Sequence, residues 1–167
     1  MTPLLFWSLM TPKGRNFQGI EMIDVATLLQ SKPAEVWSIS PADTVFAAIQ
    51  LMDAKGIGAL LVLQENQLVG VLSERDYARK VILKGRASSE TSVKEIMTRQ
   101  VFYTYPEQNI EDCLIVMTER RIRHLPVMQA ERVVGMISMG DVVKEIIKEQ
   151  RDKIAQLEHY ITWEESY

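Results

Sequence analysis

A seven-residue pattern, Gly-x-x-Ser-x-x-Asp, occurs twice in this chain of 167 residues. The first copy runs from Gly70 to Asp76 and the second from Gly135 to Asp141. Each copy follows two short apolar segments separated by a polar turn, a pattern typical of a β-hairpin that leads into a helix. The copies lie 65 positions apart, which indicates that the chain contains two related units.

The relationship between the two units extends well beyond this motif. When residues 36–76 are aligned with residues 101–141 without a gap, 11 of the 41 positions are identical. Unrelated sequences of ordinary composition would share roughly two or three. The identical pairs are Val36/Val101, Pro41/Pro106, Met52/Met117, Ile57/Ile122, Leu60/Leu125, Val62/Val127, Gln64/Gln129, Val69/Val134, Gly70/Gly135, Ser73/Ser138 and Asp76/Asp141. An internal duplication explains this agreement.

Each unit is predicted to fold as strand–helix–strand–strand–helix, preceded by a brief helix. Pro41 or Pro106 separates the first strand from a helix that carries an apolar stripe, and Gly56 is expected to end that helix in the first unit. In the first unit we expect a brief helix at 25–29, strands at 36–39, 59–63 and 68–72, and a second helix over about 74–83. In the second unit we expect a brief helix at 93–97 and strands at 101–104, 125–128 and 133–137.

The fold class expected from this order is α+β with an α/β-like crossover, in which two pseudo-symmetric units pack as one module. The helix between two parallel strands favours a right-handed connection. A single three-stranded unit buries too little apolar surface to be stable alone, so the two units are expected to share a core.

The chain divides into five predicted segments. Residues 22–84 form the first unit, 85–92 a polar linker, 93–150 the second unit and 151–167 a helical tail. Residues 1–21 match nothing in the repeat and are expected to form a flexible N-terminal extension. Either translation begins at Met22, or the extension is an apolar peptide that docks on a groove.

The tail continues one apolar stripe beyond the repeat. Its residues are Val143, Ile147, Ile154, Leu157 and Ile161. A long helix with such a stripe needs a partner surface. Packing on its own module and packing across a dimer interface are both consistent with the pattern.

Composition excludes several classes of protein. The net charge of −3 leaves no basic footprint for nucleic acid, and no stretch approaches the roughly 20 apolar residues of a membrane span. Cys113 is the single cysteine and aligns with Ala48, so we expect a buried thiol in a reducing compartment, by default the cytoplasm. No cluster has metal-ligand spacing and no nucleophile motif is present, so we expect neither a metal site nor an enzyme.

The repeated motif has two interpretations. Ser73 and Ser138 are predicted at helix N-termini, where backbone N–H groups favour phosphate. Asp76 and Asp141, one turn further on, could accept hydrogen bonds from the two hydroxyls of a ribose. The same spacing also describes a capping box, in which both side chains bind only the backbone. Duplication of the whole context favours the binding interpretation.

These residues resemble the tandem CBS-domain regulatory proteins over about residues 22–150. The segments that carry the resemblance are 68–76, 93–98, 122–127 and 134–141. The resemblance implies paired modules that bind adenine nucleotides between their halves, dimerise into a flat disc and have no catalysis of their own. The implied ligands are AMP, ADP, ATP, NAD and S-adenosylmethionine, and the sequence does not choose among them.

The resemblance also assigns two clefts by residue. In the first cleft, Ser73, Arg75 and Asp76 face Ile122, Arg123 and His124; in the second, Ser138 and Asp141 face Ile57, Gly58 and Ala59. Gly140 replaces the arginine of the first motif, so the first cleft is expected to be cationic and the second nearly neutral. The predicted function is a homodimeric, non-enzymatic sensor of adenosine-containing ligands. The alternative is an interaction scaffold with vestigial clefts.

Overall fold

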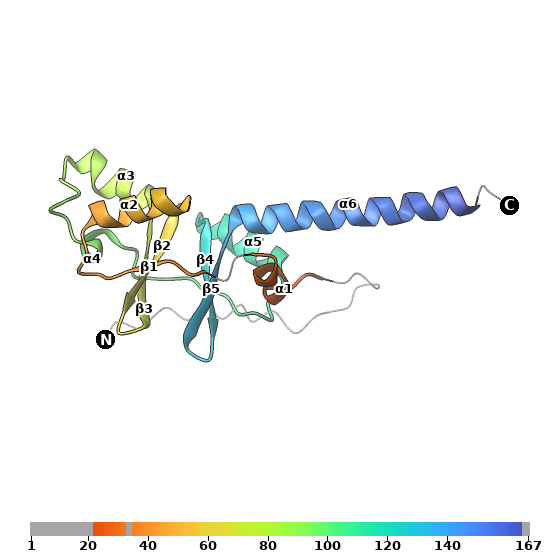
Figure 1. The fold of residues 1–167 in the computed structure, drawn as a ribbon, viewed down its shortest axis with the longest axis horizontal. Coiled ribbons are helices and arrows are strands. Elements are labelled where there is room, and N and C mark those ends of the chain that lie inside the picture. The colour runs from red at the N-terminus through yellow and green to blue at the C-terminus, as the bar shows by residue number, and fades with distance from the viewer. Residues whose placement is uncertain (1–21, 33–34, 165–167) are drawn as a thin grey trace.

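The computed structural model describes residues 22–32 and 35–164. The predicted N-terminal extension, residues 1–21, lies outside the described residues. The two units lie side by side, and one long helix leaves the second unit and extends away from both (Figure 1). No helix in the described part of the chain is long and apolar enough to cross a membrane.

The first unit has the predicted order of elements. It contains β1 (Ser38–Ile39), α2 (Val45–Lys55), β2 (Ala59–Gln64), β3 (Gln67–Ser73), α3 (Glu74–Lys80) and the 3₁₀ helix η1 (Ile82–Lys84). β1 and β2 are parallel and are joined by α2, whereas β2 and β3 form an antiparallel hairpin. α2 begins at the cap Thr44 and ends at Gly56, whose φ of 63° is left-handed, as predicted.

The second unit repeats this order except for its first strand. It contains α5 (Ile110–Arg120), β4 (His124–Gln129), β5 (Arg132–Ser138) and α6 (Met139–Glu164). The predicted strand at 101–104 is reduced to a single parallel bridge between Thr104 and Val127. The path of the chain just before residues 101–104 explains the loss of this strand. Thr98 exchanges two backbone hydrogen bonds with Val71 of β3, at 3.0 and 2.9 Å. The chain therefore enters the segment bound to the sheet of the other unit.

The two hairpins share one register. Ala59 pairs with Ser73, and 65 positions later His124 pairs with Ser138. Both hairpins carry an irregularity at the same place, after Val62 and after Val127. The duplication predicted from the sequence is thus preserved in each backbone pair around the motif.

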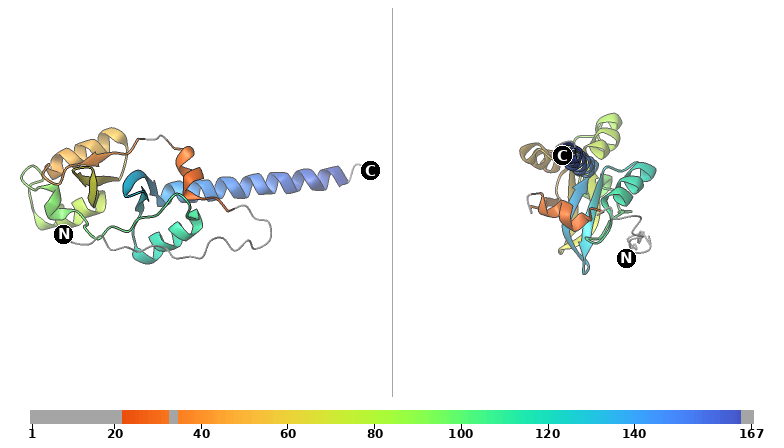
Figure 2. Two further views of the ribbon diagram at one scale, coloured as in Figure 1. Left: turned by 90° about the horizontal axis from the view of Figure 1, so that it is seen from below. Right: turned by 90° about the vertical axis from the view of Figure 1, so that its right-hand side faces the viewer.

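The two short helices are exchanged between the units. α1 (Val25–Gln30) packs with the second unit, where Val25 and Leu28 join the core around α5. α4 (Val93–Ile96) packs with the first unit, in the core around α2. Figure 2 shows α1 beside the second unit, away from the sheet of its own. Each core is therefore completed by a helix that belongs, along the chain, to the other repeat.

The polar segment 85–92 is ordered against the first unit. The backbone N–H of Val45 donates to the carbonyl of Thr91 (2.8 Å), and that of Phe46 donates to the carbonyl of Ser88 (3.0 Å). These bonds satisfy two N–H groups at the start of α2 that have no partner within the helix. The segment therefore caps α2 as well as connecting the units.

Candidate functional site

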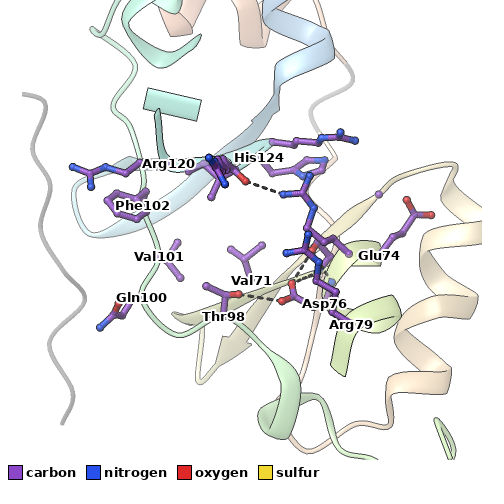
Figure 3. Close-up of a pocket in the computed structure, with 16 residues that line it drawn as sticks. Val71, Glu74, Asp76, Arg79, Thr98, Gln100, Val101, Phe102, Arg120 and His124 are labelled. Carbon is purple, nitrogen blue, oxygen red and sulfur yellow. Dashed lines mark hydrogen bonds between the residues drawn. The ribbon is translucent and has the colours of Figure 1, made fainter. Parts of the chain in front are cut away.

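A cavity of about 450 Å³ lies between the two units. β3 and α3 form one wall, the end of α5 and the start of β4 form another, and the segment after α4 crosses between them (Figure 3). All six residues predicted for the first cleft line this cavity: Ser73, Arg75, Asp76, Ile122, Arg123 and His124. The exchange of α4 between the units is what brings the segment from Thr98 to Phe102 to this place.

Ser73 and Asp76 form a capping box at the start of α3. The Asp76 carboxylate accepts from the backbone N–H of Ser73 (3.0 Å) and from its hydroxyl (2.7 Å), and the Asp76 N–H donates to the Ser73 Oγ (3.2 Å). The structure therefore contains the capping box that the spacing of the motif allows. The other carboxylate oxygen, Oδ1, lies 2.7 Å from the Lys80 ammonium and also accepts a long bond from the Thr98 hydroxyl (3.3 Å). A ligand hydroxyl could replace the Thr98 donor (Figure 3).

Arg75 links the two units beside the cavity. Its Nη1 donates to the backbone carbonyl of Arg121 at 2.9 Å. Arg121 ends α5 with a φ of 55°, in the left-handed conformation that Gly56 adopts at the corresponding end of α2. A non-glycine residue in this region is strained, so the turn that carries Arg121 and Ile122 is held in place at some conformational cost.

The lining of the cavity is strongly cationic. Five arginines, Arg75, Arg79, Arg120, Arg121 and Arg123, stand against two carboxylates, Glu74 and Asp76. Arg79, Arg120 and Arg121 were not among the residues predicted for this cleft. A signal for them was present, because Arg79 lies one turn beyond Asp76 and the other two directly precede Ile122. The excess of guanidinium groups favours a ligand with several negative charges.

Part of the cavity lining is apolar. Val71, Val101 and Phe102 form this part, and the guanidinium of Arg120 lies 5.3 Å from the centre of the Phe102 ring. Such a surface can hold a planar base while the arginines hold charged groups. None of these three residues was predicted for a cleft, although Val71 lies inside the first motif and Val101 belongs to one of the identical pairs of the repeat.

The His124 imidazole is mostly neutral at pH 7, because its pKa is lowered. Burial lowers its pKa, and the charges of Lys32 and Arg123 lower it further, against the opposing effect of Asp141. A neutral imidazole offers one donor and one acceptor. His124 also faces Gly58, because a Cβ on that glycine would lie 3.7 Å from the His124 ring. Gly58, predicted for the second cleft, in fact lines the first cavity.

The second motif also caps its helix but has a different partner. The Asp141 carboxylate accepts from the Ser138 N–H (2.8 Å), and the Asp141 N–H donates to the Ser138 Oγ (3.1 Å). Lys32, from the segment after α1, donates to the same carboxylate at 2.5 Å. The second cleft was predicted to be nearly neutral, and the structure instead places an ammonium group there. No sequence pattern indicated this contact, because Lys32 precedes the aligned part of the repeat.

The remaining members of the predicted second cleft are less accessible. Ala59 is completely buried and Ile57 packs against the core of the first unit.

Cys113 is buried as predicted, and burial raises the pKa of its thiol to about 11. Within residues 22–32 and 35–164, no group of His, Cys, Asp and Glu side chains is arranged to hold a metal ion.

Comparison with known families matches this chain twice. The family described as CBS domain matches residues 27–82 and 93–148. A protein from Arabidopsis thaliana, "CBS domain-containing protein CBSX3, mitochondrial", is 35% identical over 160 residues, which span 90% of this chain and 77% of the relative.

Solved structures show the same architecture. A protein with CBS domains from Burkholderia ambifaria superposes with a TM-score of 0.75 and 46% identity, over 77% of this chain and 96% of its own. The CBS domain pair of protein MJ0100, solved with 5'-methylthioadenosine and S-adenosyl-L-methionine, superposes with a TM-score of 0.68 over 77% of this chain and 98% of its own. At 24% identity, this second likeness is one of fold.

Proposed function

Because this chain belongs to the family of paired CBS-domain proteins, we propose that it is a non-enzymatic regulatory module that binds an adenosine-containing ligand in the first cleft. The observation that carries this proposal is the cavity between the units. There, five arginines surround one carboxylate that can take ribose and a wall that can take a base. AMP, ADP, ATP and NAD all combine these three chemical features.

Each part of such a ligand has a matching surface. Asp76 accepts from the ribose hydroxyls, displacing the long bond from Thr98. Val71, Val101 and Ile122 contact the base, and the arginines contact the phosphates. Hydrogen bonds to charged groups contribute about 1.5–3 kcal/mol each, so the phosphate contacts supply most of the binding energy.

Signalling follows from the position of Arg75. Its guanidinium donates to the backbone carbonyl of Arg121 in the other unit. A phosphate between the units competes for that guanidinium and draws both walls toward itself. Binding therefore changes how tightly the units are joined, which a partner of the module can detect.

Ligand binding is tested by thermal unfolding of ligand-free protein with adenosine, AMP, ADP, ATP, NAD and S-adenosylmethionine. S-adenosylmethionine is included because the MJ0100 pair was solved with it. A ligand at 100 times its dissociation constant adds about 2.7 kcal/mol to the free energy of unfolding. A midpoint that none of the six ligands shifts contradicts the proposed function.

A second function, self-association, is favoured by the exposed face of α6. Val143, Ile147, Ile154 and Leu157 are 39–62% exposed, so their own module covers this face only in part. Ile147, Ile154 and Ile161 recur every seven residues, and Leu157 occupies the intervening position. This spacing is typical of a two-stranded coiled coil. We therefore propose a homodimer joined, at least in part, through α6.

The cytoplasm is the compartment we propose, on the basis of a single cysteine that the fold keeps as a buried thiol. The Arabidopsis relative is described as mitochondrial. Fractionation of cells that express the tagged full-length chain distinguishes the two compartments.

A further inference from the structure

Four arginines of the first cavity lie in two rows, one row on each unit. Arg75 and Arg79 are one turn apart on α3, so they share a face of that helix. Arg121 and Arg123 flank Ile122 in the turn between α5 and β4 of the second unit. The guanidinium of Arg75 reaches the backbone carbonyl of Arg121 at 2.9 Å, so the rows are close enough for one ligand to contact both.

These four arginines form no ion pair in the part of the chain that the structure describes. The cavity lining contains two carboxylates, those of Glu74 and Asp76. Asp76 lies 2.7 Å from the ammonium of Lys80, which balances its charge from outside the lining. Four guanidinium groups therefore face the single charge of Glu74, and the lining carries a positive charge that its own residues do not compensate.

This positive charge lies at the rim of the cavity. All four arginines are exposed, whereas Val101 is 3% exposed and the side chain of Asp76 is 15% exposed. An adenosine that places its base on Val101 and its ribose on Asp76 therefore extends its phosphates toward the two rows. One exposed arginine alone contributes little to binding, but several that repel one another are stabilised by an anion placed between them.

We propose that the first cleft binds an adenosine polyphosphate, ATP or ADP, without a magnesium ion and in preference to AMP. The inference rests on the proposed function of this cleft. The single phosphate of AMP carries about 1.5–2 negative charges at pH 7, which is too few for four guanidinium groups. Each further phosphate adds charge and more oxygens that accept hydrogen bonds from arginine. A bound Mg²⁺ offsets part of that charge and occupies phosphate oxygens that the arginines would otherwise contact, so the magnesium complex is the weaker ligand.

Equilibrium dialysis of the full chain tests this inference by measuring the affinities for AMP and ATP, first with a chelator and then with excess magnesium chloride. Potassium chloride keeps the ionic strength equal in the two series, because salt weakens the interactions of exposed charges. Without magnesium, ATP is expected to bind at least about tenfold more tightly than AMP, which corresponds to one additional hydrogen bond to a charged group. Magnesium should weaken ATP binding by a similar factor and should leave AMP binding unchanged.

A pair of variants tests the contribution of the rim. Arg79→Gln removes one guanidinium from an exposed position of α3, and glutamine preserves the helix because it is a good helix former. This variant is expected to lower the affinity for ATP roughly tenfold and to affect AMP much less. Arg99→Gln is the matched control, because Arg99 donates to the carbonyl of Lys94 and does not line the cavity. It should change neither affinity.

The outcomes separate this inference from the proposed function. ATP that binds no more tightly than AMP, or that magnesium does not weaken, would overturn the inference and leave the proposed function standing. Equal losses of AMP and ATP affinity in Arg79→Gln would show that the rim does not read the number of phosphates, and the inference would fail. If neither nucleotide bound, the inference would also fail, and NAD and S-adenosylmethionine in the same dialysis would show whether the proposed function fails with it.

Discussion

The Sδ atom of Met97 lies 2.8 Å from the point where residue 70 would carry a Cβ atom, so Gly70 is the residue that lets α4 dock on the first unit. The same relationship holds between Leu29 and Gly135 in the second unit, at 2.7 Å. The glycine of the repeated motif therefore serves the exchange of helices, and the serine and aspartate of the same motif serve the helix cap.

Replacing Gly70 with alanine is expected to destabilise the protein by about 1–3 kcal/mol, because the added methyl group overpacks the contact. Besides Met97, the methyl group would approach the backbone carbonyl of Thr98 to 3.1 Å, and backbone yields less readily than a side chain. Urea unfolding measures the change.

Gly140→Ala is the matched control. A Cβ there meets only the Ser138 Oγ, at an ordinary 3.7 Å, and the residue is helical. Alanine in a helix is favoured over glycine by about 1 kcal/mol, so this variant is expected to be as stable as the unchanged chain or more so. Equal destabilisation by both variants would contradict the proposed packing role of Gly70.

The duplication made most of the fold predictable from the sequence. Hairpins, caps and the turn at Gly56 depend on local residue chemistry, which the sequence displays directly. The exchange of α1 and α4 was not predictable, because an apolar helix such as 25–29 fits either core equally well. That choice depends on how the connecting segments run, and only the tertiary structure decides it.

The first cleft was predicted more completely than the second. Its predicted members lie on two segments inside the aligned repeat, residues 73–76 and 122–124. The repeat therefore indicated both segments together. Lys32 and residues 98–100 lie outside the ungapped alignment, where the offset changes from 65 to 68. The contacts of such residues depend on how the chain crosses from one unit to the other, and no local sequence pattern indicates that path.

Arg123→Ala is expected to weaken ligand binding in proportion to phosphate charge. Arg123 lines the cavity among four other arginines, and one charged contact contributes about 1.5–3 kcal/mol, or roughly tenfold to a hundredfold in affinity. Calorimetric titration with adenosine, AMP and ATP should show the largest loss for ATP and the smallest for adenosine.

Two further variants give this series its controls. Arg99→Ala removes an arginine that binds the carbonyl of Lys94 outside the cavity lining, and it should leave all three affinities unchanged. Asp76→Ala should weaken all three ligands alike, since all three contain ribose. Equal losses across the series for Arg123→Ala would show that this side chain does not contact phosphate.

His124 is expected to make the folded state less stable below about pH 6.5. Its pKa in the folded protein lies below the ordinary histidine value of about 6.5, so on acidification the unfolded chain takes up the proton first. The contribution is fully present above pH 6.5 and is lost as pH falls through the lowered pKa. Urea unfolding at about pH 7.5 and about pH 5.5 should show a smaller difference for His124→Gln than for the unchanged chain. Identical differences would mean that this imidazole does not titrate separately in the two states.

Removing residues 152–167 is expected to shift the protein from dimer toward monomer, because the deletion takes away Ile154 and Leu157, which are 55% and 62% exposed. The double variant Ile154→Lys with Leu157→Lys places charges on the same face without shortening the helix and should act in the same direction. Sedimentation velocity over a range of protein concentrations measures the shift.

AMP binding should be unchanged, since this part of α6 extends away from the units that form the cavity (Figure 1). Leu83→Lys is the control, because Leu83 is 76% exposed and lies on η1 of the first unit, outside α6. A dimer that persists in the deletion and dissociates in Leu83→Lys would place the interface on the first unit instead.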